Sequence, residues 1–399
     1  MKLLLCSDLH LGRTPARLPE PWRRQARTVH AWDAIIEAAL REKVNAVILG
    51  GDIVDADNGF WEALDPLETG VSKLGEAGIQ VIAVAGNHDA VVLPRLSAFL
   101  PPDTYTLLGA QGLWEELVLS ENGAPALRLH GWSFPRTHWD GDPLEDFQSA
   151  AHDGLPALGI VHGDLGASAS RYAPLSLARL QAQPVTAWLL GHIHAPRLHG
   201  GNPWVLMPGS PQPLDPSETE AHHAWITELE NGALTTPRPI APATLRYATL
   251  QIPLNADTPP GEDVIRETVM RHLEGFNCDR AVLRLRFTGE VRDPTLLQAC
   301  IQHLTDWEPG GNAVIEKIEN QTRPPFDPAA CRQLGGIHAL LADLIEKDTP
   351  EALRQRLQDL HARILRQSEF DGKGLDTPPL PDPRPHAERL LAEILETGT

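Results

Sequence analysis

Side chains that can ligate metals recur in five short blocks, and each block directly follows a short apolar run. The blocks are Asp8-Leu9-His10-Leu11-Gly12, Gly50-Gly51-Asp52-Ile53-Val54-Asp55, Gly86-Asn87-His88-Asp89, Val161-His162-Gly163 and Gly191-His192-Ile193-His194. Their mixture of oxygen and imidazole donors suits borderline first-row cations such as Mn²⁺, Fe²⁺ or Zn²⁺ better than Mg²⁺ alone or a thiolate-bound metal. The blocks therefore predict a divalent metal site.

The number of donors indicates two cations held by seven side chains. One cation would take Asp8, His10 and His194, and the other would take Asn87, His162 and His192. Asp52 would lend one oxygen to each cation. Residues i and i+2 of an extended segment point to the same side, so we expect the D-x-H and H-x-H pairs to enter one cavity. The glycines beside the ligands would let the backbone approach the metals closely.

Six short apolar runs predict the buried strands that position these blocks. They are Lys2–Cys6, Ala46–Leu49, Gln80–Ala85, Leu158–Val161, Ala187–Leu190 and Trp204–Met207. Between the first two runs, Gln25–Lys43 carries apolar residues at helical spacing. Strands that alternate with helices indicate an α/β layered core. Ligands gather at the carboxyl ends of such strands, so the five blocks should meet at one site.

The sequence pattern changes after about Ala243. Strands at Leu245–Pro253, Arg280–Thr288 and Asn312–Glu319 alternate with helices at Gly261–Gly275 and Pro294–Thr305. We therefore expect a metal-binding α/β domain over residues 1–243, a smaller α+β capping domain over 244–328 and a helical C-terminal region over 329–399. A proline-rich linker at 376–385 leads to an amphipathic helix at His386–Glu396.

The overall charge limits the kinds of partner. The chain has 34 basic and 53 acidic residues, a net charge of -19, which is the wrong sign for a protein that grips nucleic acid over its whole surface. A local exception follows the first block, where Arg13, Arg23 and Arg24 are opposed only by Glu20. These arginines are predicted to contact DNA phosphates, and a solvated loop and helix face is the alternative.

Cysteine usage and hydropathy indicate the compartment. The four cysteines show no CxxC spacing, which fits neither a disulfide framework nor a zinc ribbon, and a reducing cytoplasmic location is the simplest interpretation. No stretch approaches the ~18 apolar residues of a membrane-spanning helix. We expect no membrane association.

The order of the blocks resembles that of the calcineurin-like metallophosphoesterases: D-x-H, G-D, G-N-H-[DE], H and G-H-x-H. The resemblance covers roughly residues 1–238. Three further segments resemble the bacterial SbcD and YhaO-type DNA repair exonucleases, namely Arg171–Ser176, Gly191–Pro196 and Met207–Gln212. The resemblance implies a layered sandwich of two central β-sheets flanked by helices. It also implies a Mn²⁺-dependent exonuclease acting on DNA ends.

The expected chemistry is attack on phosphorus by a hydroxide that two cations generate from water. By resemblance, His88 acts on the phosphate or its leaving oxygen and is no ligand. Asp55 stands where related exonucleases often carry histidine, and it would hold His88 in one tautomer. Asp89 is interpreted as a cap or turn residue rather than a ligand.

The resemblance also implies partners. An SMC-like coiled-coil ATPase of the SbcC/YhaN type would bind the C-terminal helices, and a homodimer is left open. Two other functions also stay open. Asp55 and the acidic balance favour a phosphatase or nucleotide phosphodiesterase, and a scaffold with a vestigial metal site is the non-enzymatic alternative.

Overall fold

The computed structural model describes residues 1–55, 60–148, 154–166, 169–240, 243–256, 261–276, 278–334, 339 and 342–343. The chain divides into two compact units. The first comprises Met1–Thr249, His272–Leu283 and Gly310–Glu316, and the second comprises Leu250–Arg271, Arg284–Pro309 and Lys317–Thr399. The predicted linker at 376–385 and the helix at 386–396 lie outside the described residues.

The first unit contains a sheet built on four parallel strands. These are β1 (Lys2–Cys6), β2 (Ala46–Leu49), β3 (Gln80–Ala83) and β4 (Tyr105–Leu107). On the other side of β1, β13 (Ala224–Glu230) pairs antiparallel and carries β14 (Ala233–Leu234) and β15 (Arg238–Ile240). The central strands are buried on both faces, which explains why their sequences are apolar without alternation.

A second sheet has the order β11-β12-β10-β7-β6-β5. Its strands are β5 (Glu115–Glu121), β6 (Ala124–Trp132), β7 (Ala157–His162), β10 (Ala187–Gly191), β11 (Arg197–His199) and β12 (Trp204–Met207). The four inner strands run parallel, whereas β5 and β11 pair antiparallel at the edges. The carboxyl ends of β7 and β10 therefore lie side by side.

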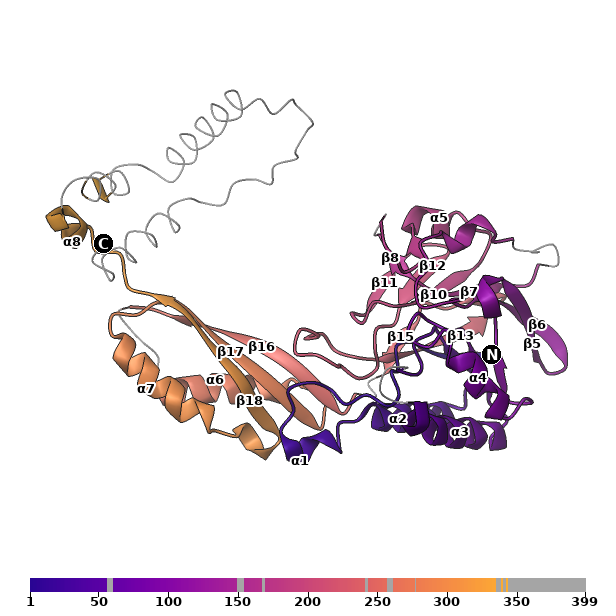
Figure 1. Cartoon of the computed structure of the whole chain (residues 1–399), viewed down its shortest axis with the longest axis horizontal. Helices are drawn as coiled ribbons and strands as arrows, with labels where there is room; N and C mark the ends of the chain where they lie inside the picture. Colours follow the sequence, from indigo (N-terminus) through magenta and orange to yellow (C-terminus); the bar gives the residue numbers. More distant parts are fainter. Residues whose placement is uncertain are drawn as a thin grey trace, which may run out of the picture. The chain divides into compact units, whose positions relative to one another are not determined.

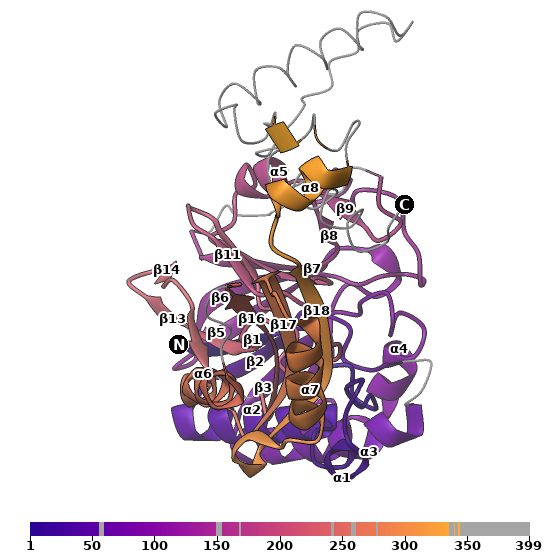
Figure 2. The ribbon, with the colours of Figure 1, turned by 90° about the vertical axis from the view of Figure 1, so that its left-hand side faces the viewer.

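Three apolar clusters define the layers of this unit. Leu3 and Leu5 of β1 pack with Leu158 of β7 and other inner residues of the second sheet, which forms the core between the sheets. Helices α2 (Thr28–Glu42) and α3 (Phe60–Glu76) cover the outer face of the first sheet and lie side by side (Figures 1 and 2). Helix α5 (Leu177–Gln181) and surrounding loops cover the second sheet. The expected sandwich of two sheets flanked by helices is confirmed.

The contact between α2 and α3 depends on a glycine. The indole of Trp32 is fully buried, and its Nε1 donates a hydrogen bond to the carbonyl oxygen of Pro66 at 3.1 Å. A Cβ on Gly70 would lie 2.3 Å from that Nε1. The absence of a side chain at Gly70 therefore lets the large indole pack against the backbone of α3.

The β-α-β-α-β order predicted after residue 244 is also observed. It consists of β16 (Leu245–Leu254), α6 (Glu262–Glu274), β17 (Arg280–Glu290), α7 (Pro294–Thr305) and β18 (Ala313–Arg323). The strands form one sheet in the order β16-β17-β18, and α6 and α7 lie along one face of it (Figure 1). At the start of α7, the Asp293 carboxylate accepts hydrogen bonds from the backbone N–H groups of Thr295 and Leu296.

The division into units differs from the predicted boundary near residue 243. The beginnings of all three strands, including Leu245, Tyr247 and Val282, belong to the first unit, where they pack with Leu18 and Ala26. A change of composition along the sequence does not reveal where the first unit ends, because each of the three strands begins in the first unit and continues in the second.

Several elements had no counterpart in the sequence prediction. Among the short ones are α1 (Glu20–Arg23), α4 (Leu93–Leu96), β8 (Asp164–Leu165) and β9 (Pro174–Leu175), whereas α8 (Pro328–Leu334) lies at the start of the predicted helical C-terminal region. The β5–β6 and β13–β14 hairpins were also missed. Both turn at an Asn-Gly pair with positive φ, Asn122-Gly123 and Asn231-Gly232, which is a strong hairpin signal. No helix among the described residues is long and apolar enough to cross a membrane.

Candidate metal centre

The five sequence blocks occupy the loops at the carboxyl ends of β1, β2, β3, β7 and β10. The first three strands belong to one sheet and the last two to the other. Backbone hydrogen bonds join the loops within the first sheet, from Asp8 N to Gly51 O at 2.9 Å and from His10 N to Asp52 O at 3.0 Å. Both sheets therefore contribute side chains to one buried place.

Three of the predicted ligands form a first group. The donor atoms of Asp8, His10 and His194 lie within 4.8 Å of one another. Nε2 of His10 faces Nε2 of His194 at 3.2 Å. Asp8 is fixed by Ser7 Oγ, which donates to its Oδ2 at 2.6 Å, and by the backbone N–H of His192.

The other ligands form a second group beside the first. The Asn87 Oδ1 lies 3.2 Å from His162 Nε2 and 3.1 Å from His192 Nδ1. Oδ2 of Asp52 lies 3.3 Å from His162 Nε2 and 3.9 Å from His10 Nε2. The Asp52 carboxylate thus stands between the groups, where it was predicted to serve both cations.

The backbone presents these ligands differently from the prediction. Asp8, His10, Asp52 and His192 have φ values of 54°, 45°, 48° and 102°, which no β-strand contains. The D-x-H and H-x-H pairs therefore do not enter the site by alternation of a pleated strand, and that expectation was wrong. Such backbone conformations persist only where the surrounding structure holds them, and they are common at functional sites.

The glycines of the blocks have a role that the sequence analysis did not predict. A Cβ on Gly86 would lie 2.2 Å from Asp52 Oδ1, and a Cβ on Gly191 would lie 2.4 Å from His162 Nδ1. These glycines leave room for ligand side chains, whereas we expected them to let the backbone approach the metals. The close packing holds each ligand in one orientation.

Burial and mutual charge set the protonation of the site. Burial raises the pKa of Asp8, with the nearby histidines opposing it. Burial also opposes ionisation of Asp52, but the adjacent His162 holds the pKa of Asp52 below its usual range. For His162 itself, burial lowers the pKa but Asp52 outweighs it and raises the value to about 9. Burial lowers the pKa of His192 to about 4.

This donor set fits a pair of divalent cations. Imidazole nitrogens and carboxylate oxygens converge at one place, and the Nε2 atoms of His10 and His194 lie 3.2 Å apart beside the Asp8 carboxylate. In addition, Nδ1 of His10 is buried and has no hydrogen-bond partner among the described residues. Cations bound here would have to displace the proton that His162 carries at neutral pH.

His88 and Asp55 lie at the edge of the first group. The His88 ring meets the His10 ring edge-on at 5.1 Å, and its backbone N–H donates to Asp52 Oδ1 at 2.8 Å. Donor atoms of His10, Asp55 and His88 lie within 4.8 Å of one another. Oδ2 of Asp55 also pairs with Nε of Arg13 at 3.2 Å. Asp55 therefore lies near His88 and also pairs with Arg13, and its role in orienting His88 stays a prediction.

The three predicted DNA-binding arginines occupy different surroundings. Arg13 lies at the metal centre through its pair with Asp55. Arg23, on α1, pairs with Glu20 three residues earlier, and both side chains are exposed. In the part of the chain that the structure describes, neither Arg23 nor Arg24 contacts a predicted metal ligand.

Two carboxylates support the site in ways that sequence reasoning missed. Asp89 is completely buried and accepts hydrogen bonds from Ile53 N at 2.6 Å and Gly86 N at 2.7 Å, so it ties two ligand loops together. Glu218 accepts a hydrogen bond from Nδ1 of His194 at 3.0 Å, which orients that ring. Asp89 belongs to the Gly86–Asp89 block, so the sequence indicated that it lies near the site. Glu218 lies outside all five blocks, and no spacing in the sequence indicates its role.

Comparisons with known proteins agree with this geometry. Residues 1–196 match the model of the calcineurin-like phosphoesterase family. The chain is 28% identical over 242 residues to the uncharacterized metallophosphoesterase YhaO of Bacillus subtilis, covering 57% of each chain. It is 27% identical over 365 residues to the DNA double-strand break repair protein Mre11 of Halobacterium salinarum, covering 90% of this chain and 85% of that protein. It is 25% identical over 272 residues to the SbcD component of the nuclease SbcCD of Escherichia coli, covering 59% of this chain and 66% of that protein.

Proposed function

We propose that this chain, which carries a calcineurin-like metallophosphoesterase domain, is a Mn²⁺-dependent exonuclease that hydrolyses DNA ends during repair. The observation that supports this most directly is the position of Asp52 between two groups of donors that are mostly buried. The relatives that carry a functional name support the choice of DNA, because one is named as a DNA double-strand break repair protein and another as part of a nuclease.

The residues suggest a division of labour. Two cations held by the seven ligands would lower the pKa of a water molecule and neutralise charge on the phosphate. The four imidazoles and three oxygen ligands would orient the reacting groups. Asp89 joins the Asp52 and Asn87 loops, and Glu218 orients the His194 ring. His88, which is half-buried beside His10, would donate a proton or hydrogen bond to the leaving oxygen.

A substrate panel tests the proposal. Metal-free protein is loaded with Mn²⁺, Fe²⁺, Zn²⁺ or Mg²⁺ and assayed on single-stranded, blunt-ended and overhanging linear DNA, on closed circular DNA and on bis-p-nitrophenyl phosphate. We expect Mn²⁺-dependent release of nucleotides from linear DNA, and none from the Asp52→Asn variant. Hydrolysis of the small diester without any activity on DNA would refute the nuclease assignment.

The proximity of Asp55 to His88 favours a phosphatase or nucleotide phosphodiesterase as the second candidate. A carboxylate that holds the histidine in one tautomer would assist protonation of a small leaving group as well as a DNA strand. The same panel, extended with mononucleotides and cyclic nucleotides, distinguishes the two candidates by which substrate has the higher kcat/KM.

We also propose that the protein works with an SMC-like ATPase. The support is the name of the relative from Escherichia coli, which is one component of a larger nuclease, together with a surface charge unsuited to broad DNA binding. Deletion of residues 376–399 should abolish co-purification with such an ATPase and leave hydrolysis of bis-p-nitrophenyl phosphate unchanged. Aggregation of the truncated protein would indicate that this segment belongs to its own core.

A further inference from the structure

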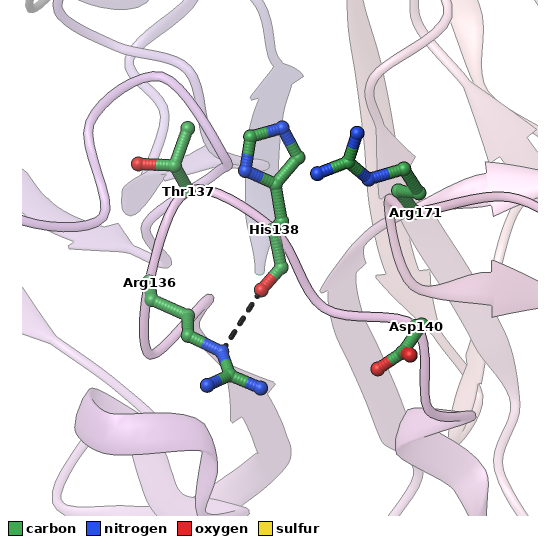
Figure 3. A pocket seen from close by; sticks show the side chains of 5 residues that line it. All are labelled: Arg136, Thr137, His138, Asp140 and Arg171. Carbon is green, nitrogen blue, oxygen red and sulfur yellow. Dashed lines mark hydrogen bonds between the residues drawn. The ribbon is translucent and has the colours of Figure 1, made fainter.

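A cavity of about 460 Å³ in the first unit is lined by two arginines together with Thr137, His138 and Asp140. Figure 3 shows Arg136 and Arg171 on two separate chain segments, with the Arg171 guanidinium directed toward the His138 ring. Both arginines are exposed. Among the residues that the structure describes, neither forms an ion pair, which is unusual in a chain of net charge -19.

The cavity is connected to the metal ligands by hydrogen bonds and ring contacts. Its first segment follows β6 and is anchored by Phe134, whose N–H donates to Ala85 O at 3.0 Å and whose ring meets the His162 ring edge-on at 5.7 Å. Ala85 directly precedes the Gly86-Asn87 ligand loop. The position of this segment is therefore coupled to two of the ligand loops.

The second segment is anchored on the other side of the same ligands. Trp139 N donates to Arg171 O at 2.9 Å, and Ala173 N donates to Trp139 O at 2.7 Å, which joins the two segments. The Tyr172 ring lies 5.1 Å from the ring of the ligand His192 and 5.5 Å from that of His138. A single aromatic ring thus separates the cavity from the metal centre.

The charges of the cavity favour a phosphate. Two guanidinium groups exceed the single Asp140 carboxylate, so the lining has a surplus of positive charge. Arg136 uses its Nε to bond His138 O at 3.1 Å, which orients the group and leaves its other four N–H donors available. The planar donor arrangement of guanidinium suits the oxygens of a phosphate, and the Thr137 hydroxyl adds a neutral donor.

We propose that Arg136 and Arg171 bind a backbone phosphate of the same DNA strand whose scissile phosphodiester lies at the metal centre. Successive phosphates of a strand lie about 3.4 Å apart along the helix axis. The phosphates next to the scissile one can therefore reach a cavity that the Tyr172 ring separates from the metal centre. The cavity then distinguishes a polynucleotide from a small phosphodiester. This inference depends on the proposed nuclease function and names the feature of the substrate that the site recognises.

The test uses full-length protein with Arg171→Gln, Arg136→Gln and both together. Arg41→Gln is the control, because Arg41 is also exposed, forms no ion pair within the described residues, and precedes β2 at the sheet edge opposite the ligand loops. For each substituted arginine we expect KM for single-stranded DNA to rise roughly tenfold. The slope of log KM against log salt should decrease by about 0.7 per lost phosphate contact.

Three further results decide the matter. The kcat on DNA and the hydrolysis of bis-p-nitrophenyl phosphate should remain at wild-type levels. Arg171→Lys should recover only part of the affinity, because it keeps the positive charge but loses the planar donor arrangement. Equal damage to both substrates, or an unchanged KM in the double variant of a protein that degrades DNA, would overturn the inference alone. Wild-type protein that neither binds nor cleaves DNA would overturn the proposed function and this inference with it.

Discussion

Replacing Gly86 with alanine should displace the Asp52 carboxylate and weaken metal binding. The φ of Gly86 lies outside the left-handed region, so alanine meets no backbone penalty there. The new Cβ would lie 2.2 Å from Asp52 Oδ1, whereas real Cβ contacts essentially never fall under 3.0 Å. The same Cβ would lie 2.6 Å from the backbone N of Asp52, so the Asp52 backbone must shift together with its carboxylate, the latter by about 0.8 Å. The hydrogen bond from Gly86 N to Asp89 resists movement of the Gly86 loop instead.

This displacement is large for a group between two cations. Functional groups must be held within about 0.5 Å of their productive positions, and misplacement by about 1 Å can reduce a rate 10²-fold. We expect fewer than two bound Mn²⁺ per chain by elemental analysis, and roughly 10²-fold slower hydrolysis of bis-p-nitrophenyl phosphate. The Gly200→Ala control should behave as wild type, because a Cβ there meets nothing within 4 Å. A folded Gly86→Ala protein with two Mn²⁺ and the wild-type rate would refute the reasoning.

Other substitutions and a pH titration test the remaining roles. His88→Ala should keep both metals yet slow hydrolysis about 10²-fold or more, and metal loss in this variant would contradict the assignment of His88 as a proton donor that is no ligand. His162→Ala, in contrast, should lose metal directly. Glu218→Gln should weaken Mn²⁺ binding by about 10–100-fold in calorimetric titration, and unchanged affinity would mean that His194 needs no carboxylate to orient it. In metal-free protein the His162 pKa is raised from 6.5 to about 9, so the stability it contributes is present below pH 6.5 and lost as the pH rises through 9. The melting temperature of chelator-treated protein should therefore fall between pH 6.5 and about 9 more than that of Mn²⁺-loaded protein. An equal fall for both forms would show that the His162–Asp52 pair does not cause the pH dependence of stability.

Local signals in the sequence were sufficient for much of the fold. The apolar runs Lys2–Cys6, Ala46–Leu49 and Trp204–Met207 are strands with the predicted bounds. Helix α7 also begins and ends as predicted, because Asp293 and Pro294 mark its start with a cap and a proline. The missed hairpins carried an equally local signal in their Asn-Gly turns, so the sequence alone was sufficient to predict them as well.

The supporting contacts of the site could not be predicted in the same way. The backbone N–H of His192 donates to Asp8 across 184 residues, and Asp89 binds Ile53 across 36 residues. Glu218 reaches His194 from a loop with no periodic pattern. The cavity at Arg136 and Arg171 depends on two loops that are joined by backbone hydrogen bonds from Trp139 to Arg171 and from Ala173 to Trp139. Local propensity carries no information about such contacts.

The sequence by itself determined which side chains could bind metals, their order along the chain and the strands whose ends carry them, because apolar runs, glycines and caps act over a few residues. Only the tertiary structure decided which glycines leave room for ligand side chains and which carboxylates hold the histidines in place. The physical reason is that these features arise where two sheets pack against each other. Their packing fixes the left-handed backbone at Asp8 and Asp52, which no local preference favours.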